Sequence, residues 1–460
     1  MQVTARTWHI GIFGTFDVEN YGDLLFPILA EAELSKRLGS VQLHRFSYNA
    51  KSQAEWPYAV TSVTDLPELA EQLDGVLIGG GFIVRFDKVV AHGYLPPTPD
   101  IHHPTGYWLS PALIAQQHGV PVIWNAPGMH CNDIPQWSTP LLKLALEHSQ
   151  CVRVRDEPTR ESLSALSPNT DIQVLPDTAF NLPSLIDEQH PSAAFTELRQ
   201  AFGLDAPFIV IQSIHVVEPF LQLFEQHPEA LAGYRLLVIP IGPVLGDHHM
   251  VVSTRMPDTI TLPFWPEPLL LAEILCHAQA VIGHSYHLSI SALVFGVSVF
   301  STADLSTGKY TALAKMGQMH ALPPAGELTV QWFTSRLGKT QPSASLSAAK
   351  VELSAYWDQV AEIIVQGKTS TRSALNRFWQ HLPTLLESGD QAPVKPSEPL
   401  TPTLDFMNIE LNARQRQIYQ LTEQLALSKT QVMALQNSNS FKLTAPLRSL
   451  RRGFRKLRER

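Results

Sequence analysis

Short apolar runs alternate with longer amphipathic stretches along the first 180 residues. The apolar runs predict strands, and stretches that keep apolar residues on one side predict helices. Strands that alternate with helices favour a parallel sheet covered on both faces. The predicted strands are His9–Phe16, Gln42–Phe46, Asp74–Ile78, Pro121–Asn125, Cys151–Arg155 and Gln173–Leu175, and the helices are Gly22–Leu38, Pro111–His118 and Leu141–His148.

A break rich in Pro, Ser and charge follows at Asn181–Ala194, and the pattern then restarts. Two such halves predict an α/β fold of two Rossmann-like domains, residues 1–190 and 191–386, with the active site in the cleft between them. The second half contains predicted strands at Phe208–Gln212, Arg235–Pro240, Ala280–Gly283 and Ser298–Phe300, and helices at Pro268–His277, Tyr286–Phe295, Val330–Leu337 and Ala348–Ile364.

The composition changes again from residue 387, where proline recurs at every third position from Pro393 to Pro402. This predicts an extended spacer over residues 387–403. Beyond it, apolar residues keep alternating spacings of three and four, which predicts a coiled coil over residues 404–437 and a homo-oligomer formed through it. A single amphipathic helix on the enzyme body is the alternative.

The last segment, residues 438–460, is strongly basic. Residues 441–460 contain eight Lys or Arg and one Glu, which leaves a charge of −15 on the other 440 residues of a chain with net charge −8. A basic amphipathic helix is able to lie in the interface of an anionic membrane, so we expect peripheral contact with the inner membrane. A solvated or partner-bound tail is the alternative. The acidic body argues against a nucleic-acid partner.

Length and composition are those of a globular enzyme. At 460 residues the chain is too long for one core, and 44 % apolar with 17 % charged residues fits neither a disordered nor a fibrous protein. No apolar run approaches the length of a membrane span, and the N-terminus has no signal-peptide pattern. Three widely spaced cysteines, Cys131, Cys151 and Cys276, suggest neither disulfides nor zinc, so we expect a cytoplasmic protein.

Four motifs of the first domain follow predicted strands, where ligands of α/β sheets bind. Asn20–Asp23 opens the first helix, and its polar side chains would otherwise cap it. Gly79, Gly80 and Gly81 let backbone approach an anion, or simply make a tight turn. Arg153 and Arg155 offer forked donors for phosphate or carboxylate, unless Arg155 pairs with Asp156. Asp177 either faces the cleft or only terminates a strand.

The second domain contributes the segment Gly283–His287, which opens a helix after an apolar strand. His287 is a candidate acid/base, and the helix N-terminus would favour a bound anion, although a lone histidine here would more often be structural. No His, Asp or Glu cluster has metal-ligand spacing, so we expect no metal.

In order and spacing, these five motifs resemble the polysaccharide pyruvyl transferase family. The family pattern has N-x-G-D, a strand ending in GGG, R-D, P-D and G-x-[RS]-x-H segments, matched here over roughly residues 9 to 300. The resemblance implies a GT-B-like fold and transfer of the enolpyruvyl unit of phosphoenolpyruvate to a sugar as a ketal. The acceptor would be a sugar or lipid-linked oligosaccharide of a bacterial surface polysaccharide, and no cofactor is implied.

Two positions depart from the family. Many members have Arg where this chain has Ser285, and another Arg where it has Ser213-Ile214-His215. His215, His284 and Arg153 are the residues we expect to take over this anion contact.

The predicted mechanism places the donor between the domains. Its phosphate and carboxylate would lie near Gly79–Gly81, Arg155 and the helix that follows His284 and Ser285, and Asn20 would lie nearby. His287 would be the general acid/base, Asp23 would orient or deprotonate the acceptor, and Asp177 would complete the catalytic set.

Two other functions stay open from the sequence. One is a nucleotide-sugar glycosyltransferase with the same two-domain fold, because Ser440–Arg448 resembles the tail of many bacterial cell-surface glycosyltransferases. The other is a catalytically inactive scaffold that recruits a surface-polysaccharide assembly through the coiled coil and tail.

Overall fold

The computed structural model describes residues 6–86, 104–129, 134–247, 256, 259–306, 309–324, 326–340, 343–369 and 372–390. The chain divides into two compact units, Met1–Thr401 and Pro402–Arg460, and all described residues belong to the first. The predicted coiled coil at 404–437 and basic tail at 438–460 therefore lie outside the described residues. Within the described residues, no helix has both the length and the apolarity needed to cross a bilayer.

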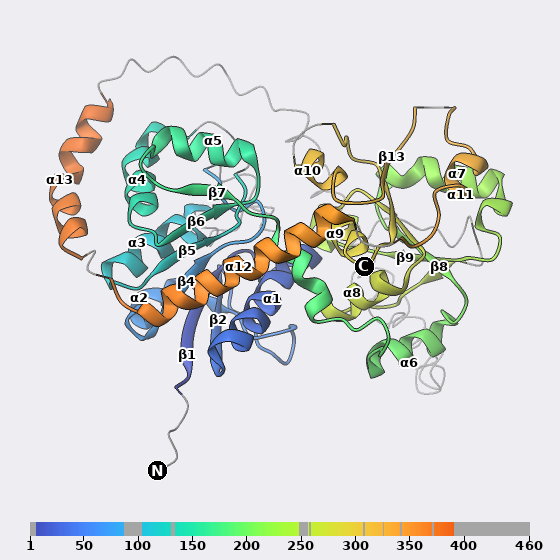
Figure 1. The fold of residues 1–460 in the computed structure, drawn as a ribbon, viewed down its shortest axis with the longest axis horizontal. Coiled ribbons are helices and arrows are strands. Elements are labelled where there is room, and N and C mark those ends of the chain that lie inside the picture. Colours follow the sequence, from blue (N-terminus) through green and yellow to red (C-terminus); the bar gives the residue numbers. More distant parts are fainter. Residues whose placement is uncertain are drawn as a thin grey trace, which may run out of the picture. The chain divides into compact units, whose positions relative to one another are not determined.

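The first half of the chain forms a parallel sheet (Figure 1). Seven strands of the described residues take part, in the order β3-β2-β1-β4-β5-β6-β7, and all neighbours pair in parallel. The strands are β1 (Trp8–Phe13), β2 (Val41–Ser47), β3 (Thr61–Ser62), β4 (Gly75–Ile78), β5 (Val122–Asn125), β6 (Cys151–Val154) and β7 (Ile172–Val174), and the helices are α1 (Tyr21–Leu38), α2 (Leu66–Leu69), α3 (Leu109–Gln117), α4 (Thr139–Glu147) and α5 (Glu157–Leu166).

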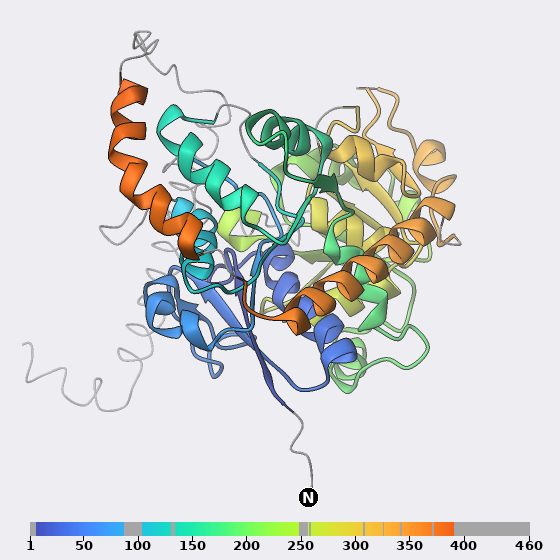
Figure 2. The same cartoon turned by 60° about the vertical axis from the view of Figure 1, so that its left-hand side comes forward.

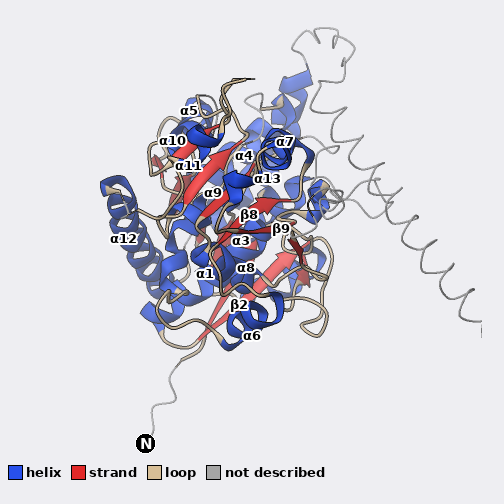
Figure 3. Ribbon diagram, turned by 90° about the vertical axis from the view of Figure 1, so that its right-hand side faces the viewer, coloured by secondary structure: helices blue, strands red, loops and turns tan. Residues whose placement is uncertain are grey.

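The second half repeats this design. Six described strands form the order β10-β9-β8-β11-β12-β13, again all parallel, with helices packed on the strands (Figure 3). The strands are β8 (Phe208–Gln212), β9 (Arg235–Ile239), β10 (Ile260–Thr261), β11 (Ala280–Gly283), β12 (Ser298–Ser301) and β13 (Met319–Ala321), and the helices are α6 (Ala193–Phe202), α7 (Glu218–Gln226), α8 (Pro268–His277), α9 (Tyr286–Leu293), α10 (Tyr310–Ala314) and α11 (Val330–Thr334).

The predicted α/β fold of two Rossmann-like sheets is confirmed by this topology. Each sheet has a point where the strand order reverses, between β1 and β4 in the first and between β8 and β11 in the second. Ligands of open α/β sheets bind beyond the carboxyl ends of the strands at such points. The segments that follow β1, β4, β8 and β11 are therefore the places to look for a site.

Two helices that follow the second sheet in the sequence pack against the first half of the protein. Helix α12 (Ala344–Gln366) begins beside the second sheet, where the Ser343 hydroxyl donates to the carbonyl of Met316. It then crosses α1, as Figures 1 and 2 both show, and the Tyr356 hydroxyl donates to Oδ1 of Asn125 at 2.8 Å. The sequence assigned this helix to the second domain, but its apolar side also covers the first, with Trp357 fully buried.

Helix α13 (Arg372–Asp390) follows and packs on α3. It includes residues 387–390, which the sequence analysis assigned to the spacer. These four residues precede Pro393, the first of the regularly spaced prolines. Each of them therefore has the backbone N–H group that a helix needs.

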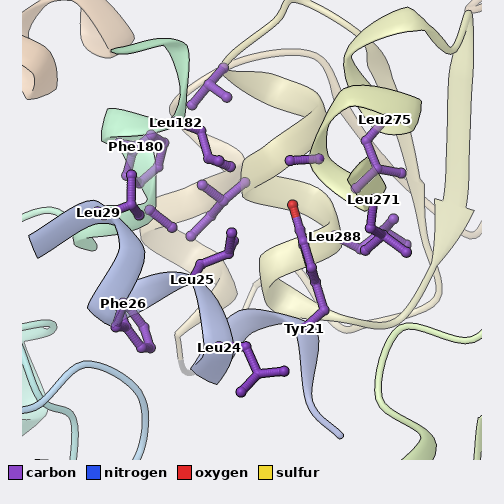
Figure 4. Close-up of a cluster of buried hydrophobic side chains, with 14 of the residues drawn as sticks. Tyr21, Leu24, Leu25, Phe26, Leu29, Phe180, Leu182, Leu271, Leu275 and Leu288 are labelled. Atoms are coloured by element: carbon purple, nitrogen blue, oxygen red, sulfur yellow. The ribbon is translucent and has the colours of Figure 1, made fainter. Parts of the chain in front are cut away.

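Helices from both halves share one apolar core. Figure 4 shows Tyr21 of α1 beside Leu288 of α9, and Leu24 and Leu25 of α1 and Leu271 of α8 belong to the same buried cluster. All five side chains are buried. Burial of apolar surface is the main favourable term in folding, so this cluster fixes the start of α1 against the start of α9.

Candidate active site

The starts of α1 and α9 meet at Gly22 and His287. A Cβ atom added to Gly22 would lie 1.8 Å from Nδ1 and 2.2 Å from Cγ of His287, far closer than two atoms can approach. The imidazole also meets the ring of Phe26 edge-on, with 5.3 Å between centroids. Glycine at position 22 is thus required for the buried histidine of the second half to lie directly against α1.

His287 faces a buried carboxylate of the first half. Its Nε2 atom lies 3.5 Å from Oδ2 of Asp177, which is 2 % exposed. The other oxygen of Asp177 accepts the backbone N–H of Ala179 at 3.0 Å and so caps the 3₁₀ helix η5 (Thr178–Ser184). The sequence left open whether Asp177 faces the cleft or only terminates a strand. In the structure β7 ends at Val174, and Asp177 caps η5 and faces His287 of the second half.

Arg155 lies on the other side of Asp177. Its Nη1 atom is 3.5 Å from the same Oδ2. Burial alone would raise the pKa of Asp177, but the hydrogen bond and charge of His287, together with the charge of Arg155, hold this pKa below its ordinary value. Asp177 is accordingly ionised at neutral pH and is shared by an imidazole and a guanidinium.

The guanidinium of Arg155 is buried without enough partners. Its side chain is only 2 % exposed, yet Nε and Nη2 have no hydrogen-bond partner among the described residues. Its Cζ atom lies over the rings of Phe82 at 4.1 Å and Tyr286 at 5.0 Å. A buried guanidinium with unused donors is suited to a bound anion, because leaving those donors unpaired is costly.

Asp23 lies in the first turn of α1 and is 6 % exposed. Its Oδ2 atom accepts the Thr15 hydroxyl at 2.8 Å and the Asn20 amide at 3.0 Å. Burial raises the pKa of Asp23 and outweighs the opposing effects of His287, Thr15 and Arg155. The alternative interpretation required the side chain of Asn20 to cap α1, but it makes no capping hydrogen bond. Its amide donates to the Asp23 carboxylate instead.

The three glycines after β4 shape the wall of this site. Gly79, Gly80 and Gly81 have φ values of 120°, 90° and 73°, a region that favours glycine. A Cβ on Gly80 would lie 2.3 Å from the Phe26 ring, and one on Gly81 would lie 3.0 Å from Oδ1 of Asp23. The glycines thus allow the loop to pass close to α1.

Lys309 is a site residue that the sequence did not reveal. It precedes α10, and its Nζ atom lies 5.1 Å from the ring centroid of Phe82, 5.4 Å from that of Tyr286 and 5.3 Å from that of Tyr310. Burial and the nearby Arg155 lower the pKa of Lys309 to about 8, against the opposing charges of Asp23, Asp177 and Asp156. Nothing in the surrounding sequence singles out this lysine, since only the fold brings it to Arg155.

The start of α9 is held by a buried amide. Oε1 of Gln212 accepts the N–H groups of His284 at 2.8 Å and Ser285 at 2.9 Å, while its Nε2 atom donates to Asp247 at 2.8 Å. These two N–H groups were expected to bind an anion, but they are already paired with Gln212. Ser285 caps α9 by accepting the N–H of Leu288 at 3.4 Å.

The residues expected to replace the missing arginines lie apart from this cluster. Arg153 faces α12, where it donates to Gln359 at 3.1 Å. His215 begins the 3₁₀ helix η6 (His215–Val217) after β8 and is exposed. His284 is exposed at the rim, where its Nδ1 lies 3.2 Å from the Thr302 hydroxyl. The described residues include no group of three His, Cys, Asp or Glu side chains that would hold a metal ion.

Several solved structures are distantly similar to this chain. UDP-GlcNAc 2-epimerase from Methanocaldococcus jannaschii is 9 % identical with a TM-score of 0.49, and the match covers 76 % of this chain and all of the other. UDP-GlcNAc 2-epimerase from Neisseria meningitidis bound to UDP-GlcNAc is 13 % identical with a TM-score of 0.46, over 83 % of this chain and all of the other.

A comparison with the sequences of curated proteins finds no match. The sequence profile of the family described as polysaccharide pyruvyl transferase matches residues 20–304. This segment begins at Asn20 and includes Gly79–Gly81, Arg155, Asp177 and His287, the residues that the two sheets bring together or place around the site. The chain belongs to the polysaccharide pyruvyl transferase family.

Proposed function

We propose that this protein transfers the pyruvyl unit of phosphoenolpyruvate to a sugar of a bacterial surface polysaccharide or its lipid-linked precursor, as a ketal. The observation that carries the proposal is Arg155, a buried guanidinium with two unpartnered nitrogens beside the His287–Asp177 pair. An anionic donor that must be protonated as it reacts fits this combination of an anion contact and an acid/base.

The reaction needs two sugar hydroxyls and one donor. The first hydroxyl adds to C2 of phosphoenolpyruvate while C3 gains a proton. Phosphate then leaves, and the second hydroxyl captures C2 to close the ketal. The proton of one hydroxyl ends on C3. The proton of the other returns to the acid that protonated the phosphate. The products are therefore one ketal and one inorganic phosphate.

The side chains divide these proton transfers between them. Asp23 takes the proton of the first hydroxyl and returns it to C3, a role favoured by its raised pKa. His287 protonates the departing phosphate and recovers a proton from the second hydroxyl. Asp177, ionised and 3.5 Å from Nε2, orients the imidazole of His287, and Arg155 binds the phosphate.

The test is thermal stabilisation of the full-length protein by phosphoenolpyruvate, with UDP- and GDP-sugars alongside. A ligand that binds only the folded state raises the melting temperature. We expect phosphoenolpyruvate to do so, and Arg155→Ala to abolish the shift. Arg153→Ala is the matched control, because this arginine lies two residues earlier, within β6, and faces α12. The shift in this variant should equal that of the wild type.

Two outcomes would contradict the proposal. A shift with nucleotide-sugars alone would indicate the glycosyltransferase that the sequence left open. No shift with either donor class would favour the scaffold, in which the C-terminal segments carry the function.

A further inference from the structure

Two cations from different sheets converge on one pair of aromatic rings. Arg155 comes from the segment after β6, and Lys309 from the segment between β12 and α10. Both lie over Phe82, at 4.1 and 5.1 Å from its centroid, and over Tyr286, at 5.0 and 5.4 Å. Because both charged groups lie within about 5 Å of the centroid of the same Phe82 ring, the two charges lie near each other.

The carboxylates of Asp23, Asp156 and Asp177 lie near this pair, but among them only Asp177 makes an ion pair with either cation. Arg155 has one ion-pair partner, Asp177, which it shares with His287, and no carboxylate of the described residues lies within ion-pair distance of Lys309. The repulsion is reflected in the pKa of Lys309, which burial and Arg155 lower to about 8. Like charges held together in a buried place are costly, and a bound anion removes that cost.

The two cations have different neighbours. Arg155 adjoins Asp177 and thus the acid/base His287, whereas Lys309 adjoins Tyr310, whose hydroxyl donates to the carbonyl of His284. A leaving phosphate must lie within reach of the acid that protonates it, which assigns the phosphate to Arg155. A second anionic group would then lie at Lys309.

We infer that Lys309 is a specificity-determining residue that binds the carboxylate of the donor while Arg155 binds its phosphate. This inference rests on the proposed function. In phosphoenolpyruvate both anionic groups are attached to C2, so one reacting carbon would be held from two sides by the first and the second half of the protein. Lys309 would also supply a cation that Ser285, which caps α9, does not.

Calorimetric titration of the full-length protein tests this with two ligands, phosphoenolpyruvate and vinyl phosphate, the same phosphoenol without the carboxylate. A charge-assisted contact is worth roughly tenfold or more in affinity. The wild type should therefore prefer phosphoenolpyruvate by about tenfold or more, and Lys309→Ala should lose most of this preference while keeping its affinity for vinyl phosphate.

Three variants serve as comparisons. Lys309→Arg should keep the preference because it keeps the charge. Lys315→Ala, at the exposed end of α10, should behave as the wild type. Arg155→Ala should weaken both ligands. Lys309 has no ion-pair partner among the described residues, so the melting temperature of unliganded Lys309→Ala should equal or exceed that of the wild type, which excludes misfolding as the cause.

The other outcomes overturn the inference in distinguishable ways. If Lys309→Ala keeps the preference for phosphoenolpyruvate, the carboxylate is bound elsewhere although the proposed function stands. If this variant weakens both ligands equally, Lys309 binds phosphate. If the wild type binds neither ligand, the proposed function and the inference both fail.

Discussion

At the scale of single residues, Gly22 shows how tightly the two halves of the site fit. A side chain there would overlap the imidazole of His287, and Nε2 of that imidazole is only 3.5 Å from Asp177. Because Gly22 is helical with no left-handed φ, its role is to leave space for the ring and not to permit an unusual backbone.

We expect Gly22→Ala to displace His287 and to reduce phosphoenolpyruvate-dependent phosphate release by about a hundredfold, since displacements near 1 Å at a reacting centre have effects of that size. The control is Gly242→Ala, where an added Cβ would make only an ordinary contact, 3.4 Å from Leu245. Wild-type turnover in Gly22→Ala would show that His287 does not act from the position seen here.

The pKa of Lys309 predicts a pH dependence of donor binding. The group is cationic below its pKa of about 8 and neutral above it. If the ammonium binds the donor, its contribution to phosphoenolpyruvate affinity should be full well below pH 8 and should decline as the pH rises through this pKa. Lys309→Arg, whose charge persists, should remove the fall. The measurement is the dissociation constant between pH 6.5 and 9.5; an identical decline in both proteins would assign the titration to another group.

At the scale of elements, α1 and α9 are joined by one buried hydrogen bond. The hydroxyls of Tyr21 and Ser291 lie 2.7 Å apart, and both side chains are fully buried. The bond is four residues beyond His287 on α9, and it connects the helix that carries the histidine to the helix that carries Asp23. The two residues therefore position the site without touching the reacting groups.

Removing either partner leaves a buried hydroxyl unpaired. Tyr21→Phe and Ser291→Ala should each lower the free energy of unfolding by roughly 1–3 kcal/mol, and the double variant should lose less than their sum. Tyr234→Phe, in a partly exposed position, should have no effect. Urea unfolding of the wild type, the two single variants and the double variant gives the coupling free energy between the hydroxyls. Strictly additive losses would mean that the hydroxyls do not depend on each other.

Most elements were predictable because their periodicity is strong. The predicted helix Pro268–His277 and strands Phe208–Gln212 and Ala280–Gly283 match α8, β8 and β11. Helix α5 was missed because only Thr159 and Leu163 of its residues are buried. The start of α5 was nevertheless indicated by Asp156, which caps the helix by accepting the N–H of Thr159. The sequence analysis had considered an ion pair of Asp156 with Arg155 instead.

The site was predictable where it follows strand ends and not where it depends on contacts between the halves. Asp23 and His287 follow β1 and β11, which lie at the two reversal points, whereas Arg155 and Asp177 follow β6 and β7 toward one edge of the first sheet. Lys309 lies in a loop with no pattern of its own. The pairing of Gln212 with the start of α9 was equally invisible, since a glutamine at a strand end has many other uses.

At the scale of the whole molecule, α12 connects the two sheets. Beyond the Tyr356–Asn125 hydrogen bond, Asp358 pairs with Arg37 of α1 at 2.6 Å. Further along, the backbone N–H of Thr369 donates to the carbonyl of Gly119 at 2.7 Å. The first half of the protein is therefore covered in part by chain that follows the second sheet in the sequence.

This arrangement predicts different consequences for two truncations. A chain of residues 1–401 keeps α12, α13 and every described site residue, and should match the full-length protein in melting temperature and in its response to phosphoenolpyruvate. A chain of residues 1–342 loses the fully buried Trp357 and exposes Asn125 and the apolar side of α1, and should fail to fold. A folded, donor-binding 1–342 chain would mean that α12 is dispensable. Loss of the donor response in 1–401 would instead place part of the donor site in residues 402–460, because the contacts of the first sheet would still be intact.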